Sequence, residues 1–285
     1  MRVLITGAGG QLGHDLVATC EAAGDDVIAC DRSRLDLADR DSVLRAITTT
    51  RPHAVIHAGA WTAVDACESD PDRAHLVNGL GSGWVAEACG QVGAHLVAVS
   101  TDYVFSGDKV GPYQEWDDPD PRSVYGASKL AGERRIADAL AGAAIARVAW
   151  VCGEHGGNMV KTVLGLLDRD VLRFVDDQRG CPTFTADLAP MLRRLAVERR
   201  AGVHHVTNQG ETTWYGFVRD ILEAVGADPG KVQPIATAEL DPPRPAARPA
   251  NSVLDNAALR LQGIPLLPHY RESLDRLLRS LGAVT

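Results

Sequence analysis

The sequence has 285 residues, 45% of them apolar and only 5% aromatic, and it carries a formal net charge of −8. This length and apolar content predict one large or two modest domains with an aliphatic core. The acidic balance argues against a nucleic-acid-binding surface, because such surfaces depend on clustered Lys and Arg. No run reaches the roughly 20 apolar residues of a membrane span, and the first ten residues do not resemble a secretory peptide, so we expect a cytoplasmic protein without a membrane partner.

Short apolar runs rich in β-branched residues alternate with segments of helical periodicity through the first half of the chain. The order strand, helix, strand predicts an α/β fold of the Rossmann type, a doubly wound parallel sheet with helices on both faces. The expected strands are Val3–Thr6, Val27–Cys30, Ala54–Ala58, Leu96–Ser100 and Ala144–Trp150. The expected helices are Gln11–Ala23, Arg40–Thr49, Pro71–Gln91 and Ser123–Ala141.

After residue 151 the alternation loosens. We expect short strands within residues 171–183, 203–210 and 232–237, helices at Phe184–Arg199 and Trp214–Val225, and a proline-rich loop at Asp241–Pro249. The chain is therefore divided into a Rossmann domain, residues 1–151, and a smaller, mainly substrate-binding lobe, residues 152–285. This lobe is expected to be interleaved with a late strand and helix of the Rossmann domain.

The cysteines are scattered, without a CxxC pair or a histidine at the spacing of a zinc site. We expect them to be small buried apolar residues in a reducing compartment, and we assign no metal ligands. They are Cys20, Cys30, Cys67, Cys89, Cys152 and Cys181.

A glycine-rich turn, TGAGGQLG, joins the first expected strand to the first expected helix. Gly7 would permit the tight turn, Gly10 the close approach of a pyrophosphate, and Gly13 tight packing of the helix on the strand. Because a helix N-terminus attracts anions, a turn in this position predicts a dinucleotide site rather than a plain glycine turn.

The residues after the second expected strand favour different nicotinamide cofactors. Asp31 would accept hydrogen bonds from an adenosine ribose and repel a 2′-phosphate, which favours NADH, whereas Arg32 could bind that phosphate, which favours NADPH. Asp36 and Leu37 could reach the adenine, although an Asp that caps a helix beside a core Leu explains them equally well. The choice between NADPH and NADH stays open.

Tyr125 and Lys129 are four residues apart in an expected helix, so both side chains can enter one cavity. A nearby ammonium stabilises a phenolate, and we therefore expect Lys129 to lower the pKa of Tyr125 toward neutrality. Beside a hydride carrier, this pair suits the reduction of a carbonyl group. The spacing alone is weak support, because amphipathic helices often carry it by chance, but the preceding dinucleotide turn gives it weight.

With this turn, STDYVFSG and YGASK in order, the chain resembles the extended short-chain dehydrogenase/reductase family over nearly its whole length. AWTAVDACESDP, VNGLG, DDQRGCPT and RPANSVLD are similar to members that reduce dTDP-4-dehydro-L-rhamnose, the last step of dTDP-L-rhamnose synthesis. The resemblance implies a Rossmann domain that binds NADPH or NADH and a C-terminal lobe that binds a deoxythymidine diphospho-sugar.

The resemblance also implies roles for individual residues. The catalytic residues would be Thr101, Tyr125 and Lys129. Cofactor contacts would come from Gly10, Gln11, Leu12, Asp36, Leu37, Ala60, Trp61 and Thr62, besides Tyr125 and Lys129. Substrate contacts would come from Val64, Thr101, Asp102, Tyr103, Tyr125 and Trp150.

Several of these residues have plain structural alternatives. Thr101 and Asp102 can cap a turn after a strand, and Trp150 can belong to the core. His204 and His205 look like a metal pair, but adjacent strand residues point to opposite faces and no third ligand is spaced suitably, so we assign them no chemistry.

Charged residues outside the motifs are harder to assign. For the substrate diphosphate we expect Lys161 or Arg248, because a dry pyrophosphate pocket needs cations. Asp65 and Glu68 could form a carboxylate pair, but a solvated surface position is the expectation for both.

The chain departs from the family pattern at two places. His57 and Gly59 lie in a segment where relatives read Asn-Ala-Ala, and Trp61 stands where His or Tyr is usual, so the nicotinamide half of the site is expected to pack differently. Some relatives dimerise through a magnesium ion held by acidic side chains. Asp15 and Asp187 match two of these positions, but the C-terminal helix has Ser280 or Arg279 in place of a glutamate, which favours a monomer or a weak homodimer.

Two other functions remain open. An epimerase or 4,6-dehydratase of the same family would retain its NAD; dehydratases generally have Asp-Glu after the catalytic threonine, whereas here Tyr103 follows Asp102. A non-catalytic regulatory subunit, like the β subunit of methionine adenosyltransferase, would bind a dinucleotide without turnover. The intact Thr101, Tyr125 and Lys129 argue against this second alternative.

Overall fold

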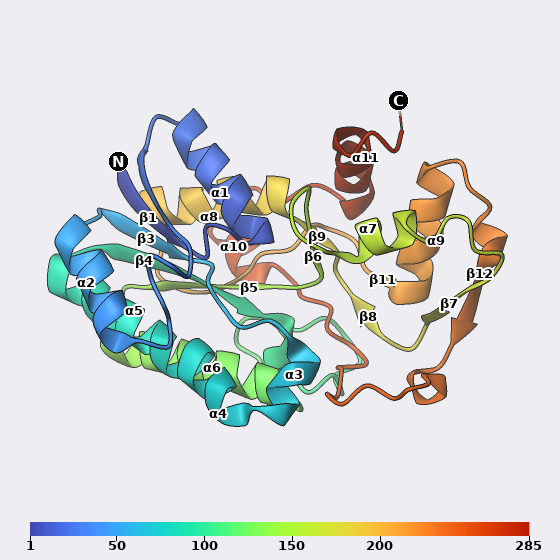
Figure 1. The fold of residues 1–285 in the computed structure, drawn as a ribbon, viewed down its shortest axis with the longest axis horizontal. Coiled ribbons are helices and arrows are strands. Elements are labelled where there is room, and N and C mark those ends of the chain that lie inside the picture. Colours follow the sequence, from blue (N-terminus) through green and yellow to red (C-terminus); the bar gives the residue numbers. More distant parts are fainter. Residues whose placement is uncertain (285) are drawn as a thin grey trace.

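A parallel sheet of six strands forms the centre of the computed structural model, which describes residues 1–284 (Figure 1). The strands are β1 (Arg2–Thr6), β2 (Asp26–Cys30), β3 (Ala54–His57), β4 (His95–Thr101), β5 (Ala144–Val148) and β10 (Gly202–His205). Their order is β10-β5-β4-β3-β1-β2, so β1 lies between the two strands that follow it in the chain. Ligands of open α/β sheets bind where the strand order reverses in this way.

Two layers of helices cover the sheet (Figure 1). One face carries α1 (Gln11–Ala22), α8 (Thr185–Val197) and α10 (Ala257–Leu261), and the other carries α2 (Arg40–Thr50), α5 (Gly81–Val92) and α6 (Val124–Ala139). Successive strand residues serve opposite cores, because strand side chains alternate between the faces of a sheet. Val3 and Ile5 pack toward the first layer and Leu4 toward the second. The doubly wound α/β prediction is confirmed.

The prediction of a single α-helix at Pro71–Gln91 was wrong in the middle of this range. The structure has α3 (Val64–Ser69), then α4 (Pro71–Ala74), the π-helical η1 (His75–Leu80) and α5. The wider turn contains Asn78, whose side chain bonds the backbone of Trp61 and the Ser128 hydroxyl. Six residues are too few for the hydrophobic pattern to separate a π from an α turn.

The second lobe has its own core of residues from α7 (Met159–Leu164), α9 (Trp214–Ala224) and α11 (Tyr270–Ser280). Short strand pairs frame it: β6 (Val151–Cys152) with β9 (Thr183–Phe184), β7 (Leu172–Val175) with β12 (Val232–Ile235), and β8 (Arg179–Gly180) with β11 (Thr212–Thr213). Three short 3-10 helices complete the set of elements: η2 (Asp102–Val104), η3 (Pro229–Lys231) and η4 (Thr237–Glu239). In contrast, β10 and α8 from this half of the sequence belong to the main sheet and its helical layer.

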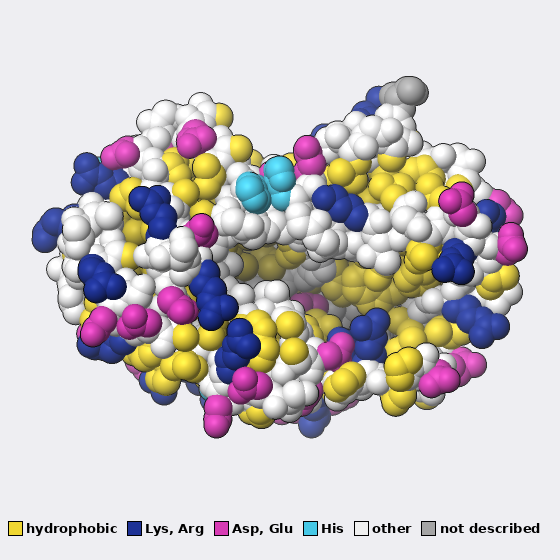
Figure 2. Space-filling view, in the orientation of Figure 1, with side chains coloured by type: hydrophobic (Ala, Val, Ile, Leu, Met, Phe, Trp, Pro, Cys, Tyr) yellow, Lys and Arg dark blue, Asp and Glu magenta, His cyan; other side chains and the backbone are white. Residues whose placement is uncertain are grey.

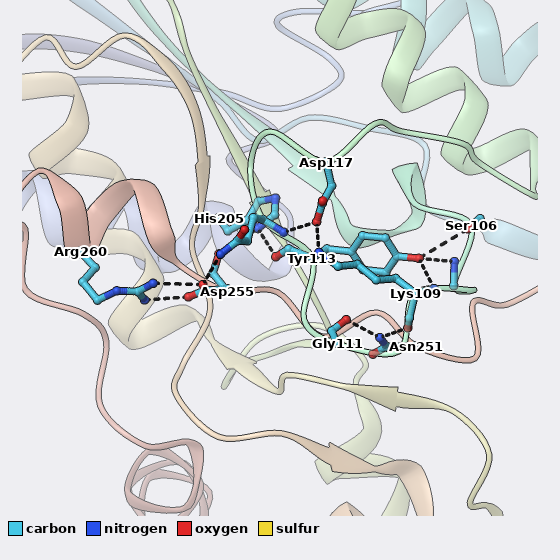
Figure 3. Close-up of polar contacts among 11 residues, drawn as sticks. Ser106, Lys109, Gly111, Tyr113, Asp117, His205, Asn251, Asp255 and Arg260 are labelled. Carbon is cyan, nitrogen blue, oxygen red and sulfur yellow. Dashed lines mark hydrogen bonds and ion pairs between the residues drawn. The ribbon is translucent and has the colours of Figure 1, made fainter.

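The loop between β4 and α6 is tied to the C-terminal half by polar contacts around Tyr113 (Figure 3). The Tyr113 hydroxyl accepts hydrogen bonds from the backbone of Gly107 and Lys109. Nδ1 of His205 lies 3.1 Å from the carbonyl oxygen of Tyr113 and 3.0 Å from that of Asp255, so this nitrogen carries a proton. His205 is buried and links the loop to the segment around Asp255.

All six cysteines are buried and unpaired, as expected. Among the helices formed by residues 1–284, none combines the length and the apolar character that crossing a bilayer requires.

Candidate active site

A cleft of about 770 Å³ opens at the carboxyl ends of the central strands, where the strand order reverses. Figure 2 shows it as a hollow that crosses the middle of the molecule, with apolar side chains inside. The cleft gathers almost every residue predicted to act on a cofactor or a substrate. They are Gly7, Gly10, Gln11, Leu12, Gly13, Asp31, Asp36, Leu37, Ala60, Trp61, Thr62, Val64, Thr101, Asp102, Tyr103, Tyr125, Lys129 and Trp150.

The glycine turn forms a cradle that side chains would fill. Gly7 has a φ of 68°, and a Cβ on it would lie 2.7 Å from the Cα of Gly59. A Cβ on Gly13 would lie 2.1 Å from the carbonyl oxygen of Gly7. The backbone at the start of α1 can therefore approach a bound pyrophosphate closely, with the helix N-terminus facing the anion. These residues fit a nicotinamide dinucleotide.

Gln11 links the cradle to the second lobe. Its Nε2 donates to the carbonyl oxygen of Val151 at 3.0 Å, and its Oε1 accepts from Asn158 at 2.7 Å. The first turn of α1 is thus held in place from both lobes.

At the end of β2, Asp31 caps the following turn. One carboxylate oxygen accepts from the backbone and hydroxyl of Ser33 and from the backbone of Arg34, and these bonds lower the pKa of Asp31. Arg32 lies on the surface, and its guanidinium is 3.8 Å from Asp36. Both Asp31 and Arg32 line the cleft at the end of β2.

The departure from the family pattern after β3 has a structural explanation. His57 is buried, with Nδ1 2.7 Å from the Thr6 hydroxyl and Nε2 3.1 Å from the Ser82 hydroxyl. Burial lowers the pKa of His57 to about 3, so the imidazole is neutral. The His57 side chain therefore links β3, to which His57 belongs, to both β1 and α5. A Cβ on Gly59 would lie 3.0 Å from the Leu37 side chain and 3.1 Å from the Thr6 hydroxyl, so an alanine there would press on both side chains.

Trp61 is held by its backbone and its ring. Its N–H donates to Asn78 at 2.8 Å, and the guanidinium of Arg73 lies 4.5 Å from the centre of its ring. Arg73 also lines the cleft, and no local sequence pattern predicts this cation–π contact between α4 and the loop after β3.

Thr101, Tyr125 and Lys129 meet in the cleft, each less than 10% exposed. Thr101 ends β4, whereas Tyr125 and Lys129 lie one turn apart on α6, which begins with Ser123 as N-cap. The Lys129 ammonium donates to the carbonyl oxygen of Val99 at 2.7 Å. Two neighbouring elements therefore bring a hydroxyl, a phenol and an ammonium into one site.

The expected lowering of the Tyr125 pKa is wrong for this structure. Burial raises the pKa of Tyr125 above its ordinary value, and hydrogen bonding to Thr101 offsets only part of the rise. Burial also lowers the pKa of Lys129 to about 8, against the opposing effect of the Glu133 carboxylate. Removing both groups from water disfavours their charged forms more than the attraction between phenolate and ammonium favours them.

Asp102 is buried directly behind Thr101. Its Oδ1 accepts the Thr101 hydroxyl at 2.9 Å, and burial raises its pKa to about 6. Oδ2 is buried without a hydrogen-bond partner among residues 1–284. Thr101 also accepts the backbone N–H of Tyr103 at 3.2 Å, so the turn-capping alternative is realised while Thr101 still faces the cleft.

Residues 1–282 match the family model described as the RmlD substrate binding domain. The chain belongs to this family. A dTDP-4-dehydrorhamnose reductase of Streptomyces griseus is 43% identical over 280 residues, which cover 96% of this chain and 91% of that protein.

Two solved structures resemble this RmlD-family chain along its full length. The dTDP-4-dehydrorhamnose reductase of Clostridium acetobutylicum has a TM-score of 0.95 and 38% identity, covering 99% of this chain and 100% of that one. The corresponding reductase of Bacillus anthracis, solved in complex with NADP, has a TM-score of 0.93 and 37% identity, covering 98% and 99%.

In this RmlD-family chain, Trp150 is paired with Trp214, which no sequence motif marks as a site residue. Its indole stacks on that of Trp214 with ring centres 3.6 Å apart and planes 7° from parallel. Trp150 has a φ of 46°, which is strained for a non-glycine residue, and its ring fills the space that a Cβ on Gly180 would need. Trp214 also lines the cleft, so two stacked indoles form its wall.

The cations expected to hold a diphosphate are engaged elsewhere. Arg248 makes two bonds to Asp65, at 2.5 and 2.7 Å, and Lys161 donates to the carbonyl oxygens of Glu154 and Gly156. Neither lines the cleft, whose cations among the described residues are Arg32, Arg73 and Lys129.

Asp65 and Glu68 are partly exposed, as a surface position implies, but both carboxylates are engaged in specific contacts. Asp65 binds Arg248, and one Glu68 oxygen accepts the backbone N–H of Val124 at the start of α6. Both carboxylates therefore fasten α3 to its surroundings, which spacing along the chain could not reveal.

Of the two acidic positions compared with a magnesium site, Asp187 is engaged within its own chain. The Asp187 carboxylate accepts from Asn208, Ser273 and Arg276. Across residues 1–284, no three His, Cys, Asp or Glu side chains gather as a metal site would require.

Proposed function

We propose that this protein reduces the 4-keto group of dTDP-4-dehydro-L-rhamnose to the hydroxyl of dTDP-L-rhamnose, with NADPH or NADH as reductant. The observation that carries this proposal is the meeting of Thr101, Tyr125 and Lys129 beside the glycine cradle in one cleft. Relatives named as reductases of this sugar nucleotide support the choice of substrate.

When bound, the nicotinamide cofactor supplies the hydride. The cradle and the residues at the ends of β2 and β3 would hold it. They are Gly7, Gly10, Gln11, Leu12, Gly13, Asp31, Asp36, Leu37, Ala60, Trp61 and Thr62, with Tyr125 and Lys129.

Tyr125 would donate the proton to the sugar oxygen. Its raised pKa suits this role, because the phenol stays protonated at neutral pH until the oxygen of the substrate becomes basic. The Lys129 ammonium, held on the same helix face, would then stabilise the phenolate that remains.

Thr101 would polarise the same carbonyl group by donating its hydroxyl hydrogen. In this structure that hydrogen is directed to Asp102, so substrate binding would require the hydroxyl to rotate toward the sugar. Hydrogen bonds aimed at developing negative charge are among the larger contributions to catalysis.

The substrate would lie on the lobe side of the cleft. The residues proposed to contact it are Val64, Thr101, Asp102, Tyr103, Tyr125 and Trp150. The stacked indoles of Trp150 and Trp214 offer this half of the cleft an apolar wall that can pack against a base or a sugar ring.

The proposal is tested by following nicotinamide absorbance with purified protein, either NADPH or NADH, and dTDP-4-dehydro-L-rhamnose. We expect oxidation of one cofactor molecule for each sugar consumed. Conversion of a sugar nucleotide without net cofactor oxidation would identify an epimerase or dehydratase. Tight dinucleotide binding without any turnover would favour the regulatory-subunit alternative.

We also propose that the protein is a monomer or a weak homodimer without a bridging magnesium ion. The engagement of Asp187 within its own chain supports this. Light scattering should give the same mass with and without a chelator, and a chelator-dependent loss of dimer would contradict the proposal.

A further inference from the structure

A buried ion pair lies beneath the proposed catalytic residues. Glu133 of α6 and Arg147 of β5 are joined by three contacts, at 2.7, 3.0 and 3.3 Å, and their side chains are 6% and 4% exposed. Buried charges are costly unless they are paired in this way. The mechanism above gives this pair no role.

A third residue joins the pair to the strand that ends in Thr101. The Ser100 hydroxyl donates to Glu133 at 2.5 Å, and Ser100 directly precedes Thr101 on β4. One residue earlier, the carbonyl oxygen of Val99 accepts the Lys129 ammonium. Helix α6 is therefore fastened to the end of β4 at two points one helical turn apart.

Glu133 also faces Lys129 along the helix. The two residues are spaced i, i+4 and lie on one face. A cavity of about 10 Å³ is lined by Lys129 and Glu133 together with His57 and Ser82. That volume is at the lower limit for a single water molecule, so little solvent can screen the carboxylate from the ammonium.

We propose that Glu133 is a positioning residue for the reductase reaction. Its carboxylate, fixed by Arg147 and Ser100, holds the helix with Tyr125 and Lys129 against the strand with Thr101, and supplies the negative charge that the Lys129 ammonium faces. The role of Glu133 rests on the proposed function, since it acts through Lys129.

The other charged and titratable groups around Lys129 leave Glu133 as the source of this charge. Arg147 from β5 is positive and already paired. His57 from β3 is neutral, because burial lowers its pKa to about 3, and Tyr125 on the same helix stays protonated because burial raises its pKa. Glu133 is the group that raises the pKa of Lys129 against the effect of burial.

Removing this charge should therefore make Lys129 lose its proton at a lower pH. The ammonium is present below the pKa of Lys129, near 8, and is lost above it. In Glu133→Gln the alkaline limb of kcat/KM should move down by about 1 pH unit, the lower end of the usual effect of a nearby opposite charge. At a pH above the Lys129 pKa of both the wild type and the variant, this shift corresponds to a roughly tenfold loss of kcat/KM.

Asp25→Asn is the matched control. Asp25 is also a buried carboxylate paired with an arginine, Arg193. However, it directly precedes β2, so it lies at the amino ends of the strands, whereas the cleft lies at their carboxyl ends. This variant should lose stability without moving the alkaline limb. An equal shift in both variants, or no shift in Glu133→Gln, would overturn the proposal.

Direct titration of Lys129 separates this proposal from the proposed function. The chain has four lysines, so ¹³C labelling at Cε gives few NMR signals, and Lys129→Met identifies the relevant one. We expect the Lys129 signal to titrate at lower pH in Glu133→Gln than in wild type, whether or not the sugar is reduced. An unchanged titration would refute the role of Glu133 even in an active enzyme.

Glu133→Gln leaves Arg147 buried without its partner and could fail to fold. The double variant Glu133→Gln/Arg147→Met removes both charges, and such replacements are often tolerated. It should still show the lowered titration of Lys129, and a wild-type titration would count against Glu133.

Discussion

At the scale of single residues, two requirements apply to Tyr125: its phenol must be protonated before the reaction, and its phenolate must be stabilised afterwards. A phenol that must donate a proton needs to be protonated in the resting state, and its burial in this site favours that form. The Lys129 charge then matters after the proton has left. Spacing in the sequence identified both residues, but the direction of the Tyr125 pKa depends on burial by Tyr103 and α3, which only the folded structure reveals.

Replacement of Tyr125 by Phe should remove the proton donor and keep the ring. We expect kcat to fall about 10²- to 10⁴-fold, the usual contribution of general acid catalysis, with an unchanged Kd for NADPH. Steady-state kinetics and fluorescence titration measure the two quantities. Tyr215→Phe is the control, since that phenol lies on α9 beside Arg219, and near-normal turnover in Tyr125→Phe would exclude Tyr125 as the acid.

The ion pair of Asp65 predicts how the free energy of unfolding depends on pH. Its bonds to Arg248 lower its pKa from 3.8 to about 2. A carboxyl with a depressed folded-state pKa stabilises the protein above its unfolded pKa and loses this effect as the pH falls through the folded value.

Asp65→Asn should therefore lower the free energy of unfolding by about 1 kcal/mol at neutral pH, a modest value because the pair is partly solvated. Denaturant unfolding should show this difference above pH 3.8 and its loss as the pH falls toward 2. A difference that is constant with pH would show that the ion pair is not its cause.

At the scale of elements, the sequence predicted regular structure well and special structure poorly. The five strands expected before residue 151 and the helices α1, α2, α6, α8 and α9 lie within two residues of their expected bounds, since hydrophobic periodicity and capping residues are local signals. The π-helical η1 and the stack of Trp150 on Trp214 arise from contacts between distant segments, and no local pattern encodes them.

The first turn of α1 gives the element-scale prediction. In Gly13→Ala the new methyl group would lie 2.1 Å from the carbonyl oxygen of Gly7, so the cradle would have to shift. Overpacking of this kind costs about 1–3 kcal/mol. We expect this cost to weaken the binding free energy of NADPH, so that the affinity drops roughly tenfold or more.

Gly90→Ala provides the comparison within another helix. A Cβ there would meet only Leu140, at an ordinary 4.0 Å, so this variant should bind NADPH normally and gain about 0.5–1 kcal/mol of stability. Equal affinities of the Gly13 and Gly90 variants, measured by calorimetry, would contradict the assignment of the cradle.

At the scale of the whole molecule, the cleft lies where the strand order reverses at β1, and its wall includes Trp214, which packs against the core of α7, α9 and α11. Gln11 at the start of α1 bonds Val151 and Asn158, and Asp65 bonds Arg248 of the proline-rich segment. Sequence motifs predicted which residues line the cleft. They could not predict that Arg248 and Lys161 would be engaged outside it, because ion pairs between distant segments depend on the assembled fold.

The measurement that tests this account most directly is the transfer of deuterium from NADPH that carries deuterium at both C4 positions of the nicotinamide to dTDP-4-dehydro-L-rhamnose, followed by mass spectrometry of the product. The account predicts dTDP-L-rhamnose with one deuterium at the sugar C4, formed by wild type and greatly slowed in Tyr125→Phe. A product without label, or no product from protein that binds NADPH, would contradict the proposed reduction.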